Sequence, residues 1–229
     1  MQIFKRLILT FLLALAFASA LDARALIFKT LDARTGLVQN TVNSLAQDPQ
    51  DFVWIGTQGG LHRYDGFALR LFQHDPGQLN SLPDSLVSVL HMGSKDRLWI
   101  GTESAGLASI QIDSGAIHRY AQSVRFKRIM ALLDIPGLGL WVADSQSLSF
   151  WPNYQPDKSE TLFHFEVNSA DVVNALASDD EGGVYIATER SGLYYHKTGK
   201  LRGIDFDATA QDNAQIPAIR QLGLDKAGR

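Results

Sequence analysis

A short apolar and aromatic segment recurs four times along this chain, and this repeat constrains the fold more than any other feature. The copies align in register at residues 52–57, 97–102, 139–144 and 183–188. Their central aromatic residues, at positions 54, 99, 141 and 185, are 45, 42 and 44 residues apart. A period of 40–50 residues is typical of solenoids, propellers and other repeat arrays.

Each repeat contains four short β-type stretches and shows no helical periodicity. Turn signals such as Asp65-Gly66 separate the stretches and supply the positive φ that tight hairpins need. The recurring segment is the second predicted strand, and the third begins near Leu61, Leu107, Leu148 or Leu193. The first strands are predicted at 42–46, 87–91, 129–133 and 172–176, and the fourth at 68–72, 116–120, 162–165 and 201–206. Four short antiparallel strands per repeat describe a propeller blade.

The chain is therefore predicted to be an all-β protein, a β-propeller with four-stranded antiparallel blades. About four blades and the first strand of a fifth, at 216–224, would form an incomplete ring, and the alternative fold is a sandwich or barrel. The predicted repeats are 36–83, 84–123, 124–168, 169–212 and a truncated 213–229.

The second strands predict how the blades pack. In the second repeat, Leu98 and Ile100 face one side of the strand and Trp99 faces the other. A strand that is apolar on both faces is covered on both faces. We therefore predict that Trp99 is buried between blades. Gly56 and Gly101 lack a side chain where we expect backbones to approach closely.

The N-terminus has the pattern of a secretory signal peptide. Lys5 and Arg6 precede an apolar run at 7–18, and Ala18-Ser19-Ala20 supplies small residues for cleavage. We expect residues 1–20 to be removed, so that the mature chain begins at Leu21. A membrane anchor is the alternative, but the run is shorter than the roughly 20 residues of a spanning helix.

Composition and motifs argue against several function classes. The 229 residues carry a formal net charge of −3, with no basic excess that would indicate nucleic-acid binding. There is no Cys, and the six His form no metal-binding motif. No serine-nucleophile or phosphate-binding motif is present. We expect no catalytic residue, no metal, no cofactor and no enzymatic activity in this chain.

The first two repeats resemble a known family. Residues 54–66 read Trp-Ile-Gly-Thr-Gln-Gly-Gly-Leu-His-Arg-Tyr-Asp-Gly and resemble the two-component regulator propeller repeat, as do 98–107. The resemblance extends over roughly 26–229. The third repeat departs from it, because Ala143-Asp144 replaces Gly-Thr and residues 151–160 read as an insertion. The fourth carries Tyr185 and Ala187 in place of Trp and Gly.

The resemblance implies a role in signalling. Such propellers form periplasmic sensor regions of membrane histidine kinases, including hybrid ones, and of diguanylate cyclases, and they respond to carbohydrates or other small molecules. It implies that residues 26–229 are an N-terminal fragment of a sensor. Its membrane anchor and output domain would lie downstream, and the full-length protein could be a homodimer.

Two other functions stay open at the sequence level. One is a periplasmic platform for protein–protein interaction, a role that propellers can have. The other is a glycoside-active enzyme, which would need two carboxylates positioned on either side of the scissile bond. Candidate ligand-binding residues lie in the insertion, where Trp151, Tyr154 and Gln155 supply aromatic and amide groups suited to a sugar. The alternative is a loop whose Trp packs on its own blade.

Overall fold

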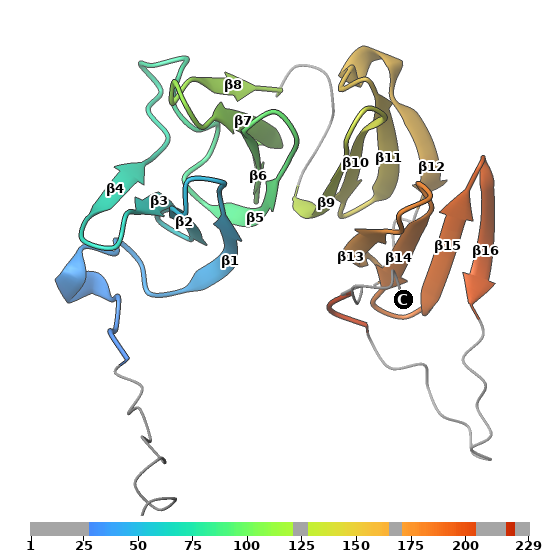
Figure 1. Cartoon of the computed structure of the whole chain (residues 1–229), viewed down its shortest axis with the longest axis horizontal. Coiled ribbons are helices and arrows are strands. Elements are labelled where there is room, and N and C mark those ends of the chain that lie inside the picture. Colours follow the sequence, from blue (N-terminus) through green and yellow to red (C-terminus); the bar gives the residue numbers. More distant parts are fainter. Residues whose placement is uncertain (1–27, 121–127, 165–170, 205–218, 223–229) are drawn as a thin grey trace, which may run out of the picture. The chain divides into compact units, whose positions relative to one another are not determined.

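The computed structural model describes residues 28–120, 128–164, 171–204 and 219–222. The chain divides into two compact units, 1–31 and 32–229. In the described part of the second unit, sixteen strands form four sheets, each of four antiparallel strands in chain order (Figure 1). The predicted all-β fold of four-stranded blades is thereby confirmed, and we refer to the sheets as the first to fourth blades.

The strands begin close to the predicted positions. The first blade comprises β1 (Val42–Gln47), β2 (Val53–Thr57), β3 (Gly60–Tyr64) and β4 (Leu69–Phe72), and the second β5 (Val87–Met92), β6 (Arg97–Thr102), β7 (Leu107–Gln111) and β8 (Ile117–Arg119). The third comprises β9 (Ile129–Ile135), β10 (Gly139–Asp144), β11 (Ser147–Pro152) and β12 (Glu160–His164), and the fourth β13 (Val173–Ser178), β14 (Val184–Thr188), β15 (Leu193–Lys197) and β16 (Lys200–Ile204). Short 3₁₀ helices are η1 (Ala33–Thr35) and η2 (Pro156–Lys158).

The Gly-Thr pair at the end of the second strand closes the hairpin that follows it. In the second blade, the buried Thr102 hydroxyl donates to the Gly106 carbonyl at 2.7 Å and accepts from the Ala105 N–H at 3.3 Å. Gly106 has φ 79°, a conformation that favours glycine. In the third blade Asp144 replaces the threonine, and its carboxylate accepts the N–H groups of Gln146 and Ser147. The sequence departure therefore preserves the turn.

Removing this hydroxyl is expected to weaken the second blade. Thr102→Val keeps the side-chain volume but loses both hydrogen bonds at a buried position. We expect the free energy of unfolding to fall by about 1–2 kcal/mol, measured by denaturant unfolding of the full chain. The exposed Thr41→Val is the control and should change it by no more than about 0.5 kcal/mol. Equal effects of the two variants would contradict this role.

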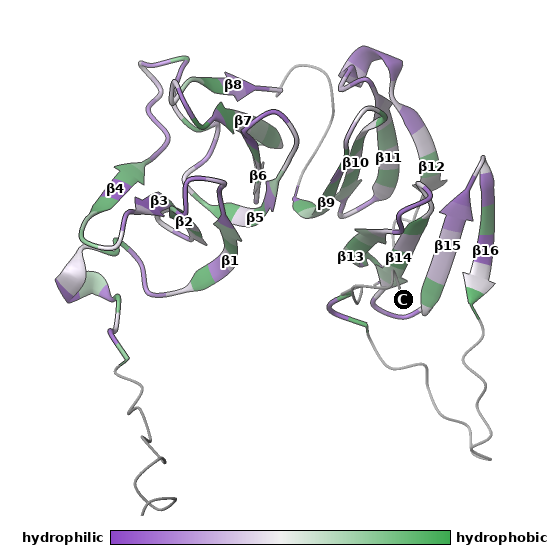
Figure 2. Ribbon diagram, viewed as in Figure 1, coloured by the Kyte–Doolittle hydropathy of each residue, from purple (hydrophilic) through white to green (hydrophobic). Residues whose placement is uncertain are grey.

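Neighbouring blades pack closely where the second strand has glycine. A Cβ on Gly56 would lie 2.7 Å from Val87, and one on Gly101 would lie 2.7 Å from Ile129. Val87 and Ile129 are the first residues of β5 and β9, so the first strand of each blade lies against the second strand of the preceding blade. The next blade does approach closely at both glycines, but with side chains and not with its backbone as predicted. Figure 2 shows that hydrophilic residues are frequent in β12 and β16, the last strands of the third and fourth blades.

The repeated tryptophans form the packed layers between blades. Trp99 is completely buried, as predicted, and packs with Ile129, Leu132 and Leu140 of the third blade. Trp54 packs in the same way with β5 and β6 residues, and Trp141 with residues of β13 and β14. Each of these indoles therefore faces the blade that follows its own.

The third blade differs from its sequence interpretation in one respect. Residues 151–160 read as an insertion, but Trp151 and Pro152 belong to β11 and Glu160 begins β12. Trp151 is opposite Leu140 in the β10–β11 pair and is completely buried. Burial of this indole between the second and third blades stabilises the extra strand length, so the connection is confined to 153–159.

Side chains of the first strands also join consecutive blades through hydrogen bonds. Asn43 donates to the Val87 carbonyl, and Ser88 donates to the Ile129 carbonyl. Asn174 makes the equivalent bond with the Ile219 carbonyl at 3.2 Å. Ile219 therefore takes the position that Val87 and Ile129 have in earlier repeats. Residues 219–222 of the strand predicted at 216–224 are described and belong to no strand, and its other residues lie outside the described residues.

Residues 1–27 also lie outside the described residues, so the predicted signal peptide stays a prediction. The described parts of the chain contain no helix with the length and hydropathy needed to cross a bilayer.

Candidate functional site

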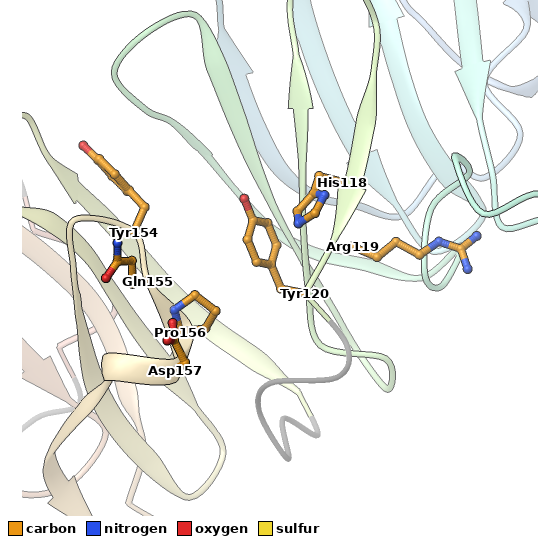
Figure 3. A pocket seen from close by; sticks show the side chains of 7 residues that line it. All are labelled: His118, Arg119, Tyr120, Tyr154, Gln155, Pro156 and Asp157. Carbon is orange, nitrogen blue, oxygen red and sulfur yellow. The ribbon is translucent and has the colours of Figure 1, made fainter.

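A cleft of about 450 Å³ lies between the second and third blades. One wall comes from the end of β8 and the residue after it, and the other from the β11–β12 connection (Figure 3). The lining residues are His118, Arg119, Tyr120, Tyr154, Gln155, Pro156 and Asp157. The volume is within the range of about 300–1,000 Å³ that is usual for small-molecule sites.

Tyr154 is the most firmly held residue of the cleft. Its backbone is left-handed, with φ 62°, and its ring stacks on Trp99 with centroids 6.0 Å apart. Its hydroxyl donates to Asp134 Oδ1 at 3.0 Å and lies 2.9 Å from Ser94 Oγ. Burial raises the pKa of the phenol, and the bond with Ser94 opposes this. The hydroxyl is therefore protonated at neutral pH and engaged with protein, so that a ligand would meet the ring.

Asp134 is the buried carboxylate that organises this side of the cleft. Besides Tyr154, its oxygens accept the Trp99 indole N–H at 3.0 Å and the Ser94 N–H at 3.2 Å. In the first blade the corresponding indole, of Trp54, donates to Asp48 in the turn of its own blade. The equivalent turn position in the second blade is Gly93, so the carboxylate comes from the neighbouring blade instead.

Gly93 leaves the space that this exchange requires. A Cβ at position 93 would lie 2.5 Å from Asp134 Oδ2 and 2.6 Å from Trp99 Nε1. Any other residue there would displace the carboxylate or the indole. Asp134 therefore links the Trp99 indole of the second blade to the Tyr154 loop of the third.

Tyr120 forms the aromatic part of the opposite wall. Its ring lies 5.4 Å from Trp99 and 5.8 Å from Trp151, centroid to centroid. The exposed His118 meets it edge-on at 4.6 Å. Tyr120 is half-buried, so the two tyrosine rings are the aromatic surfaces of the cleft, and Trp99 and Trp151 lie beneath them.

The Arg119 guanidinium turns away from the cleft (Figure 3). It donates to the carbonyls of Ser81 and Gln78 at 2.7 and 2.8 Å and to the Ser81 hydroxyl at 2.5 Å. These bonds hold the β4–β5 loop against β8 and engage the guanidinium N–H groups. Arg119 therefore contributes no free positive charge to the cleft.

The polar groups that face solvent at the cleft are on Gln155, Asp157 and His118, all of which are exposed. Gln155 is the N-cap residue of η2, but its side chain makes no capping hydrogen bond. Its amide can therefore donate and accept at once. Aromatic rings flanked by amide, carboxylate and imidazole groups suit a small polar ligand with an apolar face, such as a sugar ring.

The three residues singled out in the sequence are close together but not equivalent. Tyr154 and Gln155 line the cleft, whereas Trp151 is completely buried and offers no face to a ligand. Sequence reasoning missed His118, Tyr120 and Asp157. The recurrence of an aromatic residue at the end of the fourth strand, Phe72 and then Tyr120, is the signal that could have indicated Tyr120.

Few ionisable side chains line the cleft. In the described parts of the chain, no three His, Asp or Glu side chains gather in an arrangement that could hold a metal ion. Asp134 is saturated by hydrogen bonds, and Asp157 is the one carboxylate among the cleft residues. The arrangement is suited to binding.

Comparisons with known proteins agree with the repeat interpretation. The sequence profile of the two component regulator propeller family matches residues 36–59. Histidine kinase P4 from Formosa agariphila is 30% identical over 56 residues, which are 24% of this chain and 4% of that protein. The sequence resemblance to this repeat is confirmed.

Solved structures share the fold. The extracellular domain of BT4673 from B. thetaiotaomicron, assigned to a hybrid two component system, is similar with a TM-score of 0.64 at 19% identity. The match covers 82% of this chain and 25% of that one. Virginiamycin B lyase from Staphylococcus aureus gives a TM-score of 0.57 at 11% identity, over 74% of this chain and 57% of the lyase. The chain thus spans a small part of the signalling proteins that it matches.

Proposed function

Because the chain carries a two component regulator propeller repeat, we propose that residues 32–222 are part of the extracytoplasmic sensor of a signal-transduction protein. The similarity to the extracellular domain of BT4673 and to histidine kinase P4 supports this role. The apolar run and small residues at 7–20 agree with export to the periplasm. Sensing then depends on a ligand that the propeller binds.

We assign ligand binding to the cleft between the second and third blades. The observation that carries this assignment is the pair of tyrosine rings, Tyr120 and Tyr154. They lie beside the Gln155 amide, which makes no capping hydrogen bond. Neutral disaccharides fit this chemistry, because sugar C–H faces pack on aromatic rings and their hydroxyls need both donors and acceptors. The engaged Arg119 guanidinium gives no advantage to an anionic sugar.

Calorimetric titration of the full chain with maltose, cellobiose and laminaribiose tests the proposal. We expect saturable binding of at least one disaccharide and recovery of the sugar unchanged. Gln155→Ala should weaken that binding about three- to tenfold, the cost of one hydrogen bond. Gln146→Ala is the matched control, since Gln146 is an exposed glutamine in the β10–β11 turn.

Two outcomes would contradict the assignment. One is the absence of saturable binding for all three disaccharides. The other is binding that Gln155→Ala and Gln146→Ala weaken equally, which would place the sugar elsewhere. Release of reducing ends during incubation would favour a glycoside-active enzyme over a sensor.

A further inference from the structure

A second cleft lies between the third and fourth blades and has a different chemistry. It has a volume of about 280 Å³, and a smaller cavity of about 90 Å³ shares some of its lining residues. Trp141, Leu162 and His196 border both spaces. Phe150 and the half-exposed Leu138 add further apolar surface to the larger cleft.

His196 is the polar group that this apolar lining does not satisfy. Its ring lies 5.1 Å from Trp141, in an edge-on arrangement. Its Nε2 is buried and has no hydrogen-bond partner among the described residues. Buried polar atoms are satisfied in the great majority of folded proteins, so we expect this atom to have a partner outside the described residues, such as a bound water or ligand. Burial lowers the pKa of the imidazole, which is therefore neutral near pH 7.

Charge further limits what the cleft can accept. Glu160 is the carboxylate among its described lining residues, and no Lys or Arg is present there. A neutral imidazole does not compensate an anion, so burying a negative charge beside Glu160 would be unfavourable. A neutral group meets no such penalty, and attraction to Glu160 offsets the desolvation of a cationic one.

We propose that this cleft binds a small aromatic molecule that carries a hydroxyl or amino group and no negative charge. The aromatic ring packs against Trp141 and Phe150, where offset or edge-on contacts are favourable. The polar group supplies the missing hydrogen-bond partner of His196 Nε2. A cationic amine at the mouth is favoured by Glu160. This site is separate from the first cleft, between the second and third blades, and the proposal does not depend on sugar binding there.

Ligand-observed NMR and calorimetry on the full chain test the site with three phenols that differ in charge, of which tyramine and 4-hydroxyphenylacetate are nearly equal in size. Tyramine is cationic, phenol is neutral and 4-hydroxyphenylacetate is anionic at pH 7. We expect saturable binding of tyramine and phenol and at least about tenfold weaker binding of the anion. His196→Leu should weaken phenol binding about tenfold, whereas His196→Gln should recover part of it.

Two further variants separate this site from the first cleft and from effects on folding. His118→Leu makes the same change at the exposed histidine of the sugar cleft and should leave phenol binding unchanged. Leu138→Lys puts a cation on an exposed side chain and should weaken tyramine binding while strengthening binding of 4-hydroxyphenylacetate.

Three results would overturn the proposal. They are the absence of saturable binding for both phenol and tyramine, equal affinity for the anion, and equal effects of His196→Leu and His118→Leu. None of these depends on whether disaccharides bind the first cleft, so the two assignments fail separately.

Discussion

Trp99→Ala is expected to lower the free energy of unfolding by about 3–5 kcal/mol, the range for truncating a large aromatic residue in a core. The indole is completely buried between the second and third blades and contacts side chains of both. Its removal leaves a cavity that Tyr120 and Tyr154 border from the cleft side. Denaturant unfolding of the full chain measures the change.

Trp99→Phe separates packing from hydrogen bonding at this position. It keeps an aromatic ring but removes the N–H that donates to Asp134. We expect its loss of stability to be smaller than that of Trp99→Ala, because most of the apolar contact is retained. A loss below about 1 kcal/mol for Trp99→Ala would mean that the interface between the two blades contributes little.

Asp134→Ala is expected to destabilise the chain by about 3 kcal/mol, which is large for one hydrogen-bonding side chain. The carboxylate is buried and accepts bonds from Trp99, Ser94 and Tyr154. Hydrogen bonds to a charged group contribute about 1.5–3 kcal/mol each, and their effects are not additive. The exposed Asp180→Ala is the control and should stay within about 0.5 kcal/mol.

Gly93→Asp tests whether the carboxylate can return to the position that it has in the first blade. Alone, this variant should be destabilising by more than about 2 kcal/mol, since its Cβ meets Asp134 and Trp99 and two carboxylates share one site. Combined with Asp134→Ala, the new aspartate can accept the indole N–H as Asp48 does in the first blade. The double variant should be more stable than either single one, and additive losses would contradict the exchange.

The blades could be predicted from sequence because their signals are local and repeated. A Trp or Tyr, a small residue and a Thr or Asp recur at the same positions of successive second strands. Gly56 and Gly101 also meet the first strand of the next blade in the same way. Four aligned copies supply evidence that one strand could not. The Gly-Thr hairpin and the buried Trp99 follow from this repetition.

The clefts could not be predicted, because they form where repeats differ. Asp134 accepts the indole N–H of Trp99 from another repeat. The sequence shows that Gly93 stands where the first repeat has Asp48, but no pattern indicates that Asp134 replaces the missing carboxylate. Trp151 read as a loop residue because its strand is longer than the corresponding strands of other blades. Its burial depends on Tyr120 of the preceding blade, a contact across 31 positions that spacing alone cannot reveal.

The indole ¹H–¹⁵N spectrum of the full chain, recorded with increasing disaccharide, tests the central claim most directly. The claim is that a disaccharide binds at the cleft between the second and third blades. Trp99 and Trp151 lie beneath its tyrosine rings, whereas Trp54 lies between the first and second blades. We predict that the Trp99 and Trp151 signals shift with the binding isotherm and that Trp54 stays unchanged. A shift confined to Trp54, or calorimetric binding that leaves all four indole signals in place, would contradict the account.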